Sequence, residues 1–284
     1  MRIALVSDVH GNLPALEAAL EAIDKRHPDR ILSLGDQVNL GPCSQEVVAL
    51  LRSRNVTMLS GNHERYIRCA MANDPAYAGA NFESLRFNAK RLSPDDLNCP
   101  DSIEIEGILF CHALPGNDYF PVFDPARALP GLLARYTEGF THIICGHGHN
   151  PTHYQLPHLR LDSIDSTGSM DEGAPGMAPF AMLEITDDAM VLKRFAAIYN
   201  YTSLPHLFVS TGLADFCPIM SRVSCMQAMR NQSVLMPFVR QAMALSHERE
   251  EEHMSLATWQ EADARFPWPD GLSTAAFWRQ ATRN

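Results

Sequence analysis

Near its start the sequence reads Ile3-Ala4-Leu5-Val6-Ser7-Asp8-Val9-His10-Gly11-Asn12, and after a helical pattern it reads Ile31-Leu32-Ser33-Leu34-Gly35-Asp36. In each stretch a short apolar run, typical of a buried strand, leads directly into a polar cluster. Strands separated by a helix indicate a parallel α/β sheet, in which ligands gather at the carboxyl ends of the strands. Asp8 and His10 are two residues apart, so an extended backbone directs both to one side. We interpret this pair as half of a metal site.

Helical patterns separate the strands. The segment from Asn12 to His27 is predicted to be a helix with Asn12 as its N-cap, and Ser44 is expected to cap the next helix. Two further helices are expected over residues 81–92 and 125–136.

Other predicted strands also end in polar residues. One over residues 56–59 leads into Gly61-Asn62-His63-Glu64, and one over residues 141–145 leads into Gly146-His147-Gly148-His149. Two short facing strands between residues 102 and 111 end at His112. Three later strands alternate in polarity and are expected to form an antiparallel sheet, over residues 160–164, 179–185 and 189–197.

The composition is that of an ordinary soluble globular protein. The 284 residues are 46% hydrophobic and 20% charged, which is enough for a full α/β core. The formal net charge of -10 argues against a protein that grips nucleic acid backbones, so no nucleic acid partner is expected.

Nothing in the sequence indicates a membrane or an oxidising compartment. No apolar run reaches the ~18 residues that a transmembrane helix needs, and the first residues do not form a secretory signal. The seven cysteines are scattered without a Cys-x-x-Cys pair, which favours neither a disulfide framework nor a zinc ribbon. We therefore expect a cytoplasmic protein without a membrane partner.

The polar residues at the predicted strand ends form the candidate site. They are Asp8, His10, Asp36, Asn62, His63, His112, His147 and His149, and they include five of the 12 histidines. Most of the clusters, taken alone, are more often a cap, a turn or a core histidine, but the two imidazoles within the glycine turns of residues 146–149 build no core. Together they offer the ligand types of manganese, iron or zinc, and there are too many of them for one ion with an open position. Their number suits two ions that share a carboxylate.

These clusters resemble the motif set of the calcineurin-like metallophosphoesterase superfamily. The sequence of residues 8–12 and 35–42 is similar to the motifs of its small bacterial phosphodiesterase branch, and the resemblance spans roughly residues 1 to 200. The family often has threonine where this chain has Gly148, which removes no ligand. The resemblance implies a four-layer α/β/β/α sandwich of two mixed β-sheets flanked by helices.

The resemblance also implies roles for the individual residues. The first metal ion would be held by Asp8, His10 and His149, the second by Asn62, His112 and His147, and both by Asp36 as a bridge. A hydroxide between two ions of manganese, iron or zinc would attack phosphorus. His63 would protonate the leaving oxygen or stabilise charge there, and would not be a metal ligand.

The implied activity is the hydrolysis of a small phosphomonoester, phosphodiester or dinucleoside polyphosphate, so that the partner is a small phosphate ester or nucleotide. One alternative is a non-catalytic protein-binding scaffold of the same fold, but every ligand position is filled. The other is a nuclease of the same superfamily, against which the acidic balance counts. Residues 65–98 and 115–124 are expected to lie over the metals and to choose the substrate.

The remainder of the chain differs in character. We predict a metallophosphoesterase domain over residues 1–203 and a helical extension over residues 204–284. Apolar residues recur at helical spacing between Val234 and Leu245, and later aromatic residues require burial. The extension would pack on the domain or on a partner subunit, and the second arrangement would make a homo-oligomer.

Overall fold

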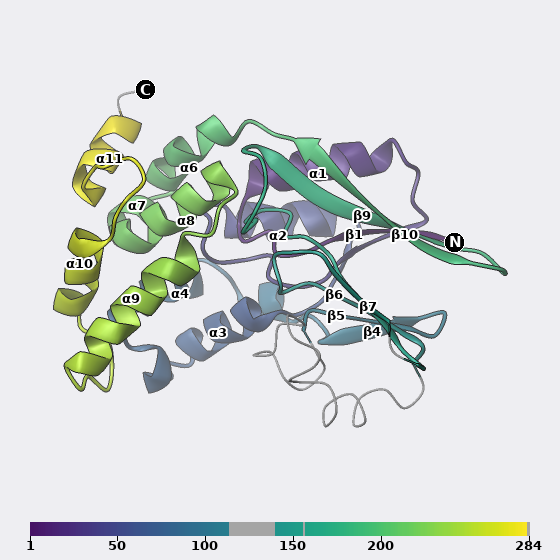
Figure 1. Ribbon diagram of the computed structural model, residues 1–284, viewed down its shortest axis with the longest axis horizontal. Helices are drawn as coiled ribbons and strands as arrows, with labels where there is room; N and C mark the ends of the chain where they lie inside the picture. The colour runs from purple at the N-terminus through teal and green to yellow at the C-terminus, as the bar shows by residue number, and fades with distance from the viewer. Residues whose placement is uncertain (114–139, 156, 283–284) are drawn as a thin grey trace.

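Two five-stranded sheets form the centre of the protein, with helices beside them (Figure 1). The computed structural model describes residues 1–113, 140–155 and 157–282. The sheets share an apolar interior in which Leu5 and Leu32 of one sheet belong to the same cluster as Phe110 and Ile144 of the other. The predicted fold of two mixed sheets flanked by helices is confirmed.

The first sheet has the strand order β10-β9-β1-β2-β3. Its strands are β1 (Arg2–Val6), β2 (Arg30–Ser33), β3 (Thr57–Met58), β9 (Met177–Ile185) and β10 (Met190–Ile198). The first three run parallel, and β9 runs antiparallel to both β1 and β10. The carboxyl ends of β1, β2 and β3 therefore meet at one edge, as the sequence predicts.

The second sheet has the order β4-β5-β6-β8-β7. Its strands are β4 (Ser102–Ile105), β5 (Ile108–Cys111), β6 (His142–Cys145), β7 (Thr152–Gln155) and β8 (Arg160–Ser163). The strands β5, β6 and β8 run parallel, while β4 and β7 run antiparallel at the edges.

The expectation that the three late strands form one antiparallel sheet is wrong. Only β9 and β10 pair in this way, and β8 lies in the other sheet between β6 and β7. Alternation in a sequence reports which face of a strand is buried, and it does not report the neighbour. The edge strand β7, which alternates between half-buried and exposed residues, is not foreseen by the sequence.

The helices of the first half lie close to the predicted positions. They are α1 (Leu13–Asp24), α2 (Ser44–Ser53), α3 (Asn62–Met71) and α4 (Glu83–Ala89), with short 3-10 turns at Pro75–Tyr77, Ala80–Phe82 and Pro94–Leu97. Asn12 caps α1 by accepting from the Ala15 N–H at 3.3 Å. Ser44 does not cap α2, because its Oγ accepts from the Asn39 N–H at 3.0 Å. The helix expected over residues 125–136 lies outside the described residues.

Beyond the sheets, the chain continues as helices that lie together at one end of the molecule (Figure 1). A 3-10 turn at Tyr201–Ser203 precedes α6 (Leu204–Ser210), α7 (Leu213–Phe216), α8 (Pro218–Arg230), α9 (Leu235–Glu248), α10 (Leu256–Arg265) and α11 (Thr274–Ala281). Phe208 and Trp278 pack into the same apolar cluster as Leu16 and Phe180 of α1 and β9. These helices therefore pack on the sheets of their own chain, while the division at residues 203 and 204 stays a prediction.

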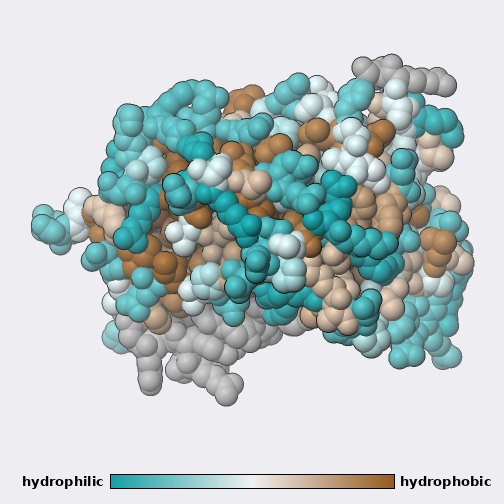
Figure 2. Space-filling view, turned by 180° about the vertical axis from the view of Figure 1, so that it is seen from behind, coloured by the Kyte–Doolittle hydropathy of each residue, from teal (hydrophilic) through white to brown (hydrophobic). Residues whose placement is uncertain are grey.

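A second apolar cluster lies within the extension itself. The ring of Phe238 contacts those of Trp259, Phe266 and Trp268, with centroids 4.9–5.6 Å apart. This cluster gives the late aromatic residues the burial that the sequence requires. On the surface seen from behind, hydrophilic residues surround smaller groups of hydrophobic ones (Figure 2). Within the described part of the chain, no helix has the length and apolar character to cross a membrane.

Candidate metal centre

The loops after β1 and β2 are bonded to each other beyond the ends of the strands. Asp8 N–H donates to the Gly35 carbonyl at 3.0 Å, and His10 N–H donates to the Asp36 carbonyl at 2.9 Å. Gly11 N–H continues the ladder to the Gln37 carbonyl at 2.8 Å. The two most polar loops of the sequence are thus held side by side by their backbones.

The backbone at these loops is unusual. Five candidate ligands have positive φ angles, namely Asp8 (52°), His10 (48°), Asp36 (53°), His147 (63°) and His149 (53°). This left-handed region is rare for residues with a Cβ and typically costs about 1–3 kcal/mol per residue. Such strain clusters at functional sites, where the surrounding structure holds it in place.

Two glycines allow the loops to come close enough. A Cβ on Gly61 would lie 2.2 Å from Asp36 Oδ1, and a Cβ on Gly146 would lie 1.9 Å from Ser7 Oγ. Any larger residue would force the Asp36 carboxylate or the β1 loop to move. The glycines in the predicted motifs therefore have a steric role.

The structure brings the candidate side chains together in two adjoining groups. Around Asp8, Oδ1 lies 3.4 Å from His149 Nε2 and 3.9 Å from His10 Nε2, and these two nitrogens are 3.1 Å apart. Around His112, Nε2 lies 3.2 Å from Asp36 Oδ2 and 3.0 Å from Asn62 Oδ1.

The remaining candidates join these groups. His147 belongs to a set with Asp36 and His112 in which one ligand atom from each lies within 4.8 Å of the others. Asp36 Oδ2 is also 3.8 Å from His10 Nε2, which places this carboxylate between the two groups. All seven predicted ligands therefore converge, although their roles as ligands stay predictions.

The donor set fits cations. Asp8 Oδ2 accepts from Ser7 Oγ at 2.5 Å and from the His147 N–H at 3.0 Å, whereas Asp8 Oδ1 is buried without a hydrogen-bond partner among the described residues. A buried carboxylate oxygen that lacks a hydrogen-bond donor and faces imidazole nitrogens is suited to bind a cation. Carboxylate, amide and imidazole donors suit manganese, iron or zinc.

The electrostatics of the cluster lead to the same conclusion. Burial and His63 lower the pKa of His10 to about 3, and burial and His112 lower the pKa of His147 to about 4. Burial would also lower the pKa of His112, but Asp36 and Asp8 outweigh it and raise the value to about 10. Without a metal, one proton on His112 therefore neutralises part of a site built around two carboxylates.

His63 adjoins these groups at their more open side. Its Nε2 lies 3.9 Å from Asp36 Oδ2, its ring meets the His10 ring edge-on at 4.8 Å, and its side chain is 17% exposed. His10, Asp36 and His63 also satisfy the distance criteria for a metal-binding group. Distance alone therefore does not separate His63 from the predicted ligands.

Three supporting residues orient these side chains. Glu64 accepts the N–H groups of Gly61, Asp36 and Gln37 at 2.7, 3.0 and 2.9 Å, which ties the start of α3 to the loop after β2. The sequence does not reveal a second support, in which Asn39 Nδ2 donates to His63 Nδ1 at 2.8 Å. Asn88 of α4 in turn donates to Asn39 Oδ1 at 3.3 Å.

The segments expected to select the substrate are only partly described. Within residues 65–98, Arg68 donates to the Leu97 carbonyl at 2.6 Å and Arg86 to the Tyr77 carbonyl at 2.8 Å, so both guanidinium groups have structural partners. The segment over residues 115–124 lies outside the described residues.

A two-sheet sandwich with carboxylates and imidazoles at its strand ends defines a metallophosphoesterase-type fold. The family model described as calcineurin-like phosphoesterase matches residues 1–199, and the chain belongs to this family. The resemblance inferred from the motifs is therefore confirmed.

Known relatives support the assignment of the fold. The crystal structure of a metallophosphoesterase from Sphaerobacter thermophilus has a TM-score of 0.57 and 22% identity, covering 75% of this chain and 95% of that one. The hypothetical protein PH1004 from Pyrococcus horikoshii OT3 has a TM-score of 0.62 and 16% identity, covering 82% and 99%. The uncharacterized protein MJ0912 of Methanocaldococcus jannaschii is 44% identical over 62 residues, which are 22% of this chain and only 26% of that protein.

Proposed function

We propose that the protein is a metal-dependent phosphoesterase that hydrolyses a small phosphomonoester, phosphodiester or dinucleoside polyphosphate. The observation that carries this proposal is the pair of buried donor groups that adjoin at Asp36, with His63 beside them. A structural cluster would not need an unpartnered carboxylate oxygen among imidazoles.

In the proposed site Asp8, His10 and His149 would hold one cation, Asn62, His112 and His147 would hold the other, and Asp36, which lies between the two groups, would be shared. Cations bound there would lower the pKa of a bound water to about 7 and would neutralise charge on phosphoryl oxygens. The His112 Nδ1–H donates to the Leu34 carbonyl at 2.9 Å, which directs Nε2 toward the site.

His63 is proposed as the acid that serves the leaving oxygen. The Asn39 amide nitrogen can only donate, so His63 Nδ1 accepts this bond and the neutral ring carries its proton on Nε2. That Nε2–H is the end of the ring that faces the metal ligands. His63 therefore presents an Nε2–H where a leaving oxygen would lie: the neutral ring would stabilise charge there by donating a hydrogen bond, and the imidazolium form would transfer a proton.

The test is a turnover assay of the manganese-loaded protein. The substrates are p-nitrophenyl phosphate, bis(p-nitrophenyl) phosphate, an alkyl phosphate and diadenosine tetraphosphate. We expect hydrolysis of at least one of them, lost with EDTA and restored by Mn²⁺. A protein that holds two metal equivalents and hydrolyses none of the four would support the scaffold alternative instead.

The His63 role has its own test. We expect His63→Asn to lower turnover of substrates with alkyl or nucleoside leaving groups by ~10²–10⁴, with a smaller effect for p-nitrophenolate, which needs no proton to leave. His158→Asn, at an exposed position outside the site, is the matched control and should leave turnover unchanged. Equal losses for both kinds of leaving group would exclude His63 as the acid.

A further inference from the structure

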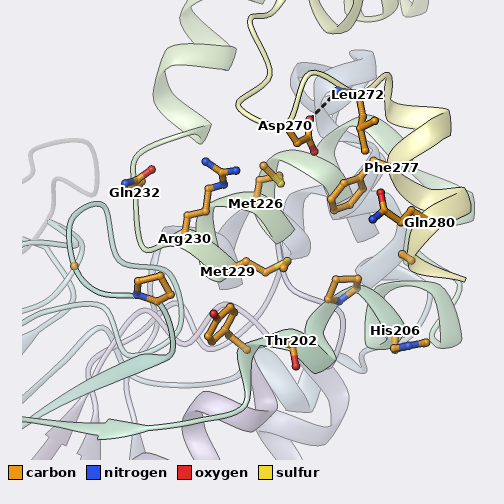
Figure 3. Close-up of a pocket in the computed structure, with 15 residues that line it drawn as sticks. Thr202, His206, Met226, Met229, Arg230, Gln232, Asp270, Leu272, Phe277 and Gln280 are labelled. Atoms are coloured by element: carbon orange, nitrogen blue, oxygen red, sulfur yellow. Dashed lines mark hydrogen bonds between the residues drawn. The ribbon is translucent and has the colours of Figure 1, made fainter. Parts of the chain in front are cut away.

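A cavity of about 690 Å³ lies among the C-terminal helices, away from the predicted ligands. Its walls come from α6, α8 and α11, from the loop before α11 and from the loop that precedes β9 (Figure 3). None of the seven predicted metal ligands lines it, and neither does His63. The cavity is therefore separate from the candidate metal centre.

The walls combine an apolar surface with one charged side chain, Arg230, that has no ion-pair partner among the described residues. Met226, Met229 and Phe277 line the cavity, and Figure 3 shows Arg230 and Gln232 toward one end of it, with Phe277 and Gln280 toward the other. Methionine side chains adapt readily to the shape of an apolar ligand.

The charged residues of the cavity differ in their partners. Asp270 also lines it, but Arg222 Nη2 binds Asp270 Oδ1 at 2.6 Å, so that this carboxylate is already neutralised. In contrast, no described residue forms a hydrogen bond or ion pair with the half-buried Arg230 guanidinium. The cavity thus presents one unpaired cation beside an apolar wall.

We propose that this cavity binds a small organic anion, with its carboxylate or phosphate on Arg230 and its apolar body against Met226, Met229 and Phe277. The volume lies within the range of about 300–1,000 Å³ that is typical of small-molecule sites. A guanidinium forms paired, charge-assisted hydrogen bonds with carboxylate or phosphate, while an apolar wall favours a ligand with a hydrocarbon part. The site is independent of the proposed hydrolysis.

Calorimetric titration of the full-length, metal-loaded protein tests the proposal. The probes are octanoate, octyl phosphate and the uncharged octanamide. We expect at least one of the anions to bind at least about ten-fold more tightly than octanamide, and the anion whose affinity falls more in Arg230→Gln identifies the preferred head group. Arg230→Gln should remove this advantage. Arg240→Gln carries the same change of charge on the exposed face of α9 and should bind as the wild type does.

Other outcomes overturn the proposal. Equal affinity of the wild type for both anions and the amide, or absence of binding by all three probes, would exclude an anion site without reference to any variant. Unchanged binding in Arg230→Gln would place the anion elsewhere. Octyl phosphate bound at the metal centre would bind wild type and variant alike, so only the difference between them reports on this cavity.

Discussion

Gln227 of α8 connects the C-terminal helices to the loop after β8. Its Nε2 donates to Ser169 Oγ and to Asp171 Oδ1, each at 3.1 Å. Its Oε1 accepts the backbone N–H groups of Val234 and Leu235 at 3.1 and 2.9 Å, which satisfies the start of α9. The residue is 2% exposed, so that water cannot replace these bonds. We predict that Gln227→Glu keeps the oxygen that serves α9, and that it can keep a bond to the loop only as the protonated acid, whose O–H replaces the amide donor.

The expected loss in the free energy of unfolding of Gln227→Glu follows from the proton that the new carboxyl group must keep in the folded state. Burial raises the pKa of Asp171, and a second carboxylate against it would stay protonated, since two adjacent buried charges are more costly. Keeping the introduced Glu protonated costs about 1.4 kcal/mol for each pH unit by which the solution lies above the ordinary Glu pKa of about 4.3. At pH 7 this cost is at most about 3.7 kcal/mol. The pKa of the introduced Glu is raised by folding, so the folded variant gains stability as the pH falls toward 4.3. We expect a loss of about 2–4 kcal/mol at pH 7 and below about 1 kcal/mol near pH 5.

Urea denaturation between pH 5 and pH 8 measures this difference. Gln227→Leu should lose stability with a weaker pH dependence, because it removes the bonds and adds no titrating group, so that only Asp171 titrates. Gln260→Glu on the exposed side of α10 is the matched control and should stay within about 0.5 kcal/mol of the wild type. A Gln227→Glu deficit that does not change with pH would refute the reasoning about the Asp171 contact.

Three further predictions concern the metal centre and the second sheet. Asp36→Ala should lose both metal equivalents in elemental analysis, because its carboxylate lies between the two groups; full retention of one ion would show that Asp36 does not bridge. Since the pKa of His112 is raised to about 10, metal binding at pH 7 should release about one proton and strengthen with rising pH, and calorimetry in buffers of different ionisation enthalpy should detect it; a buffer-independent heat would contradict this. Asp162→Asn should cost about 2–4 kcal/mol in urea denaturation at pH 7, because the buried carboxylate accepts from His142 Nε2 and Arg160 Nε, each at 2.7 Å. Burial opposes ionisation of Asp162, but these bonds outweigh it and hold the pKa of Asp162 below its ordinary value. The stability advantage of the wild type over Asp162→Asn should therefore disappear progressively as the pH falls below about 4. The exposed control, Asp188→Asn, should show no loss of stability.

The sequence predicts the meeting of the candidate ligands because of a simple geometric rule. Parallel strands carry their following loops to the same edge, so Asp8, Asp36 and Asn62 converge once β1, β2 and β3 pair in parallel. His112 and His147 arrive in the same way from the parallel strands β5 and β6. No such rule assigns β8 to its neighbours, because its alternation is equally compatible with either sheet.

The hydrogen bonds that orient the candidate ligands cannot be predicted from sequence patterns, for a different reason. The bond from Asn39 to His63 joins residues 24 positions apart, and the bond from Ser166 Oγ to the Asp8 carbonyl at 2.8 Å joins residues 158 positions apart. Neither belongs to a periodic element, so only the assembled fold brings the partners together. The second bond ties the strained turn at Asp8 to the loop that Gln227 holds from α8. Because strain at a functional turn persists only where its surroundings oppose relaxation, we infer that the extension helps to maintain the geometry of the metal centre.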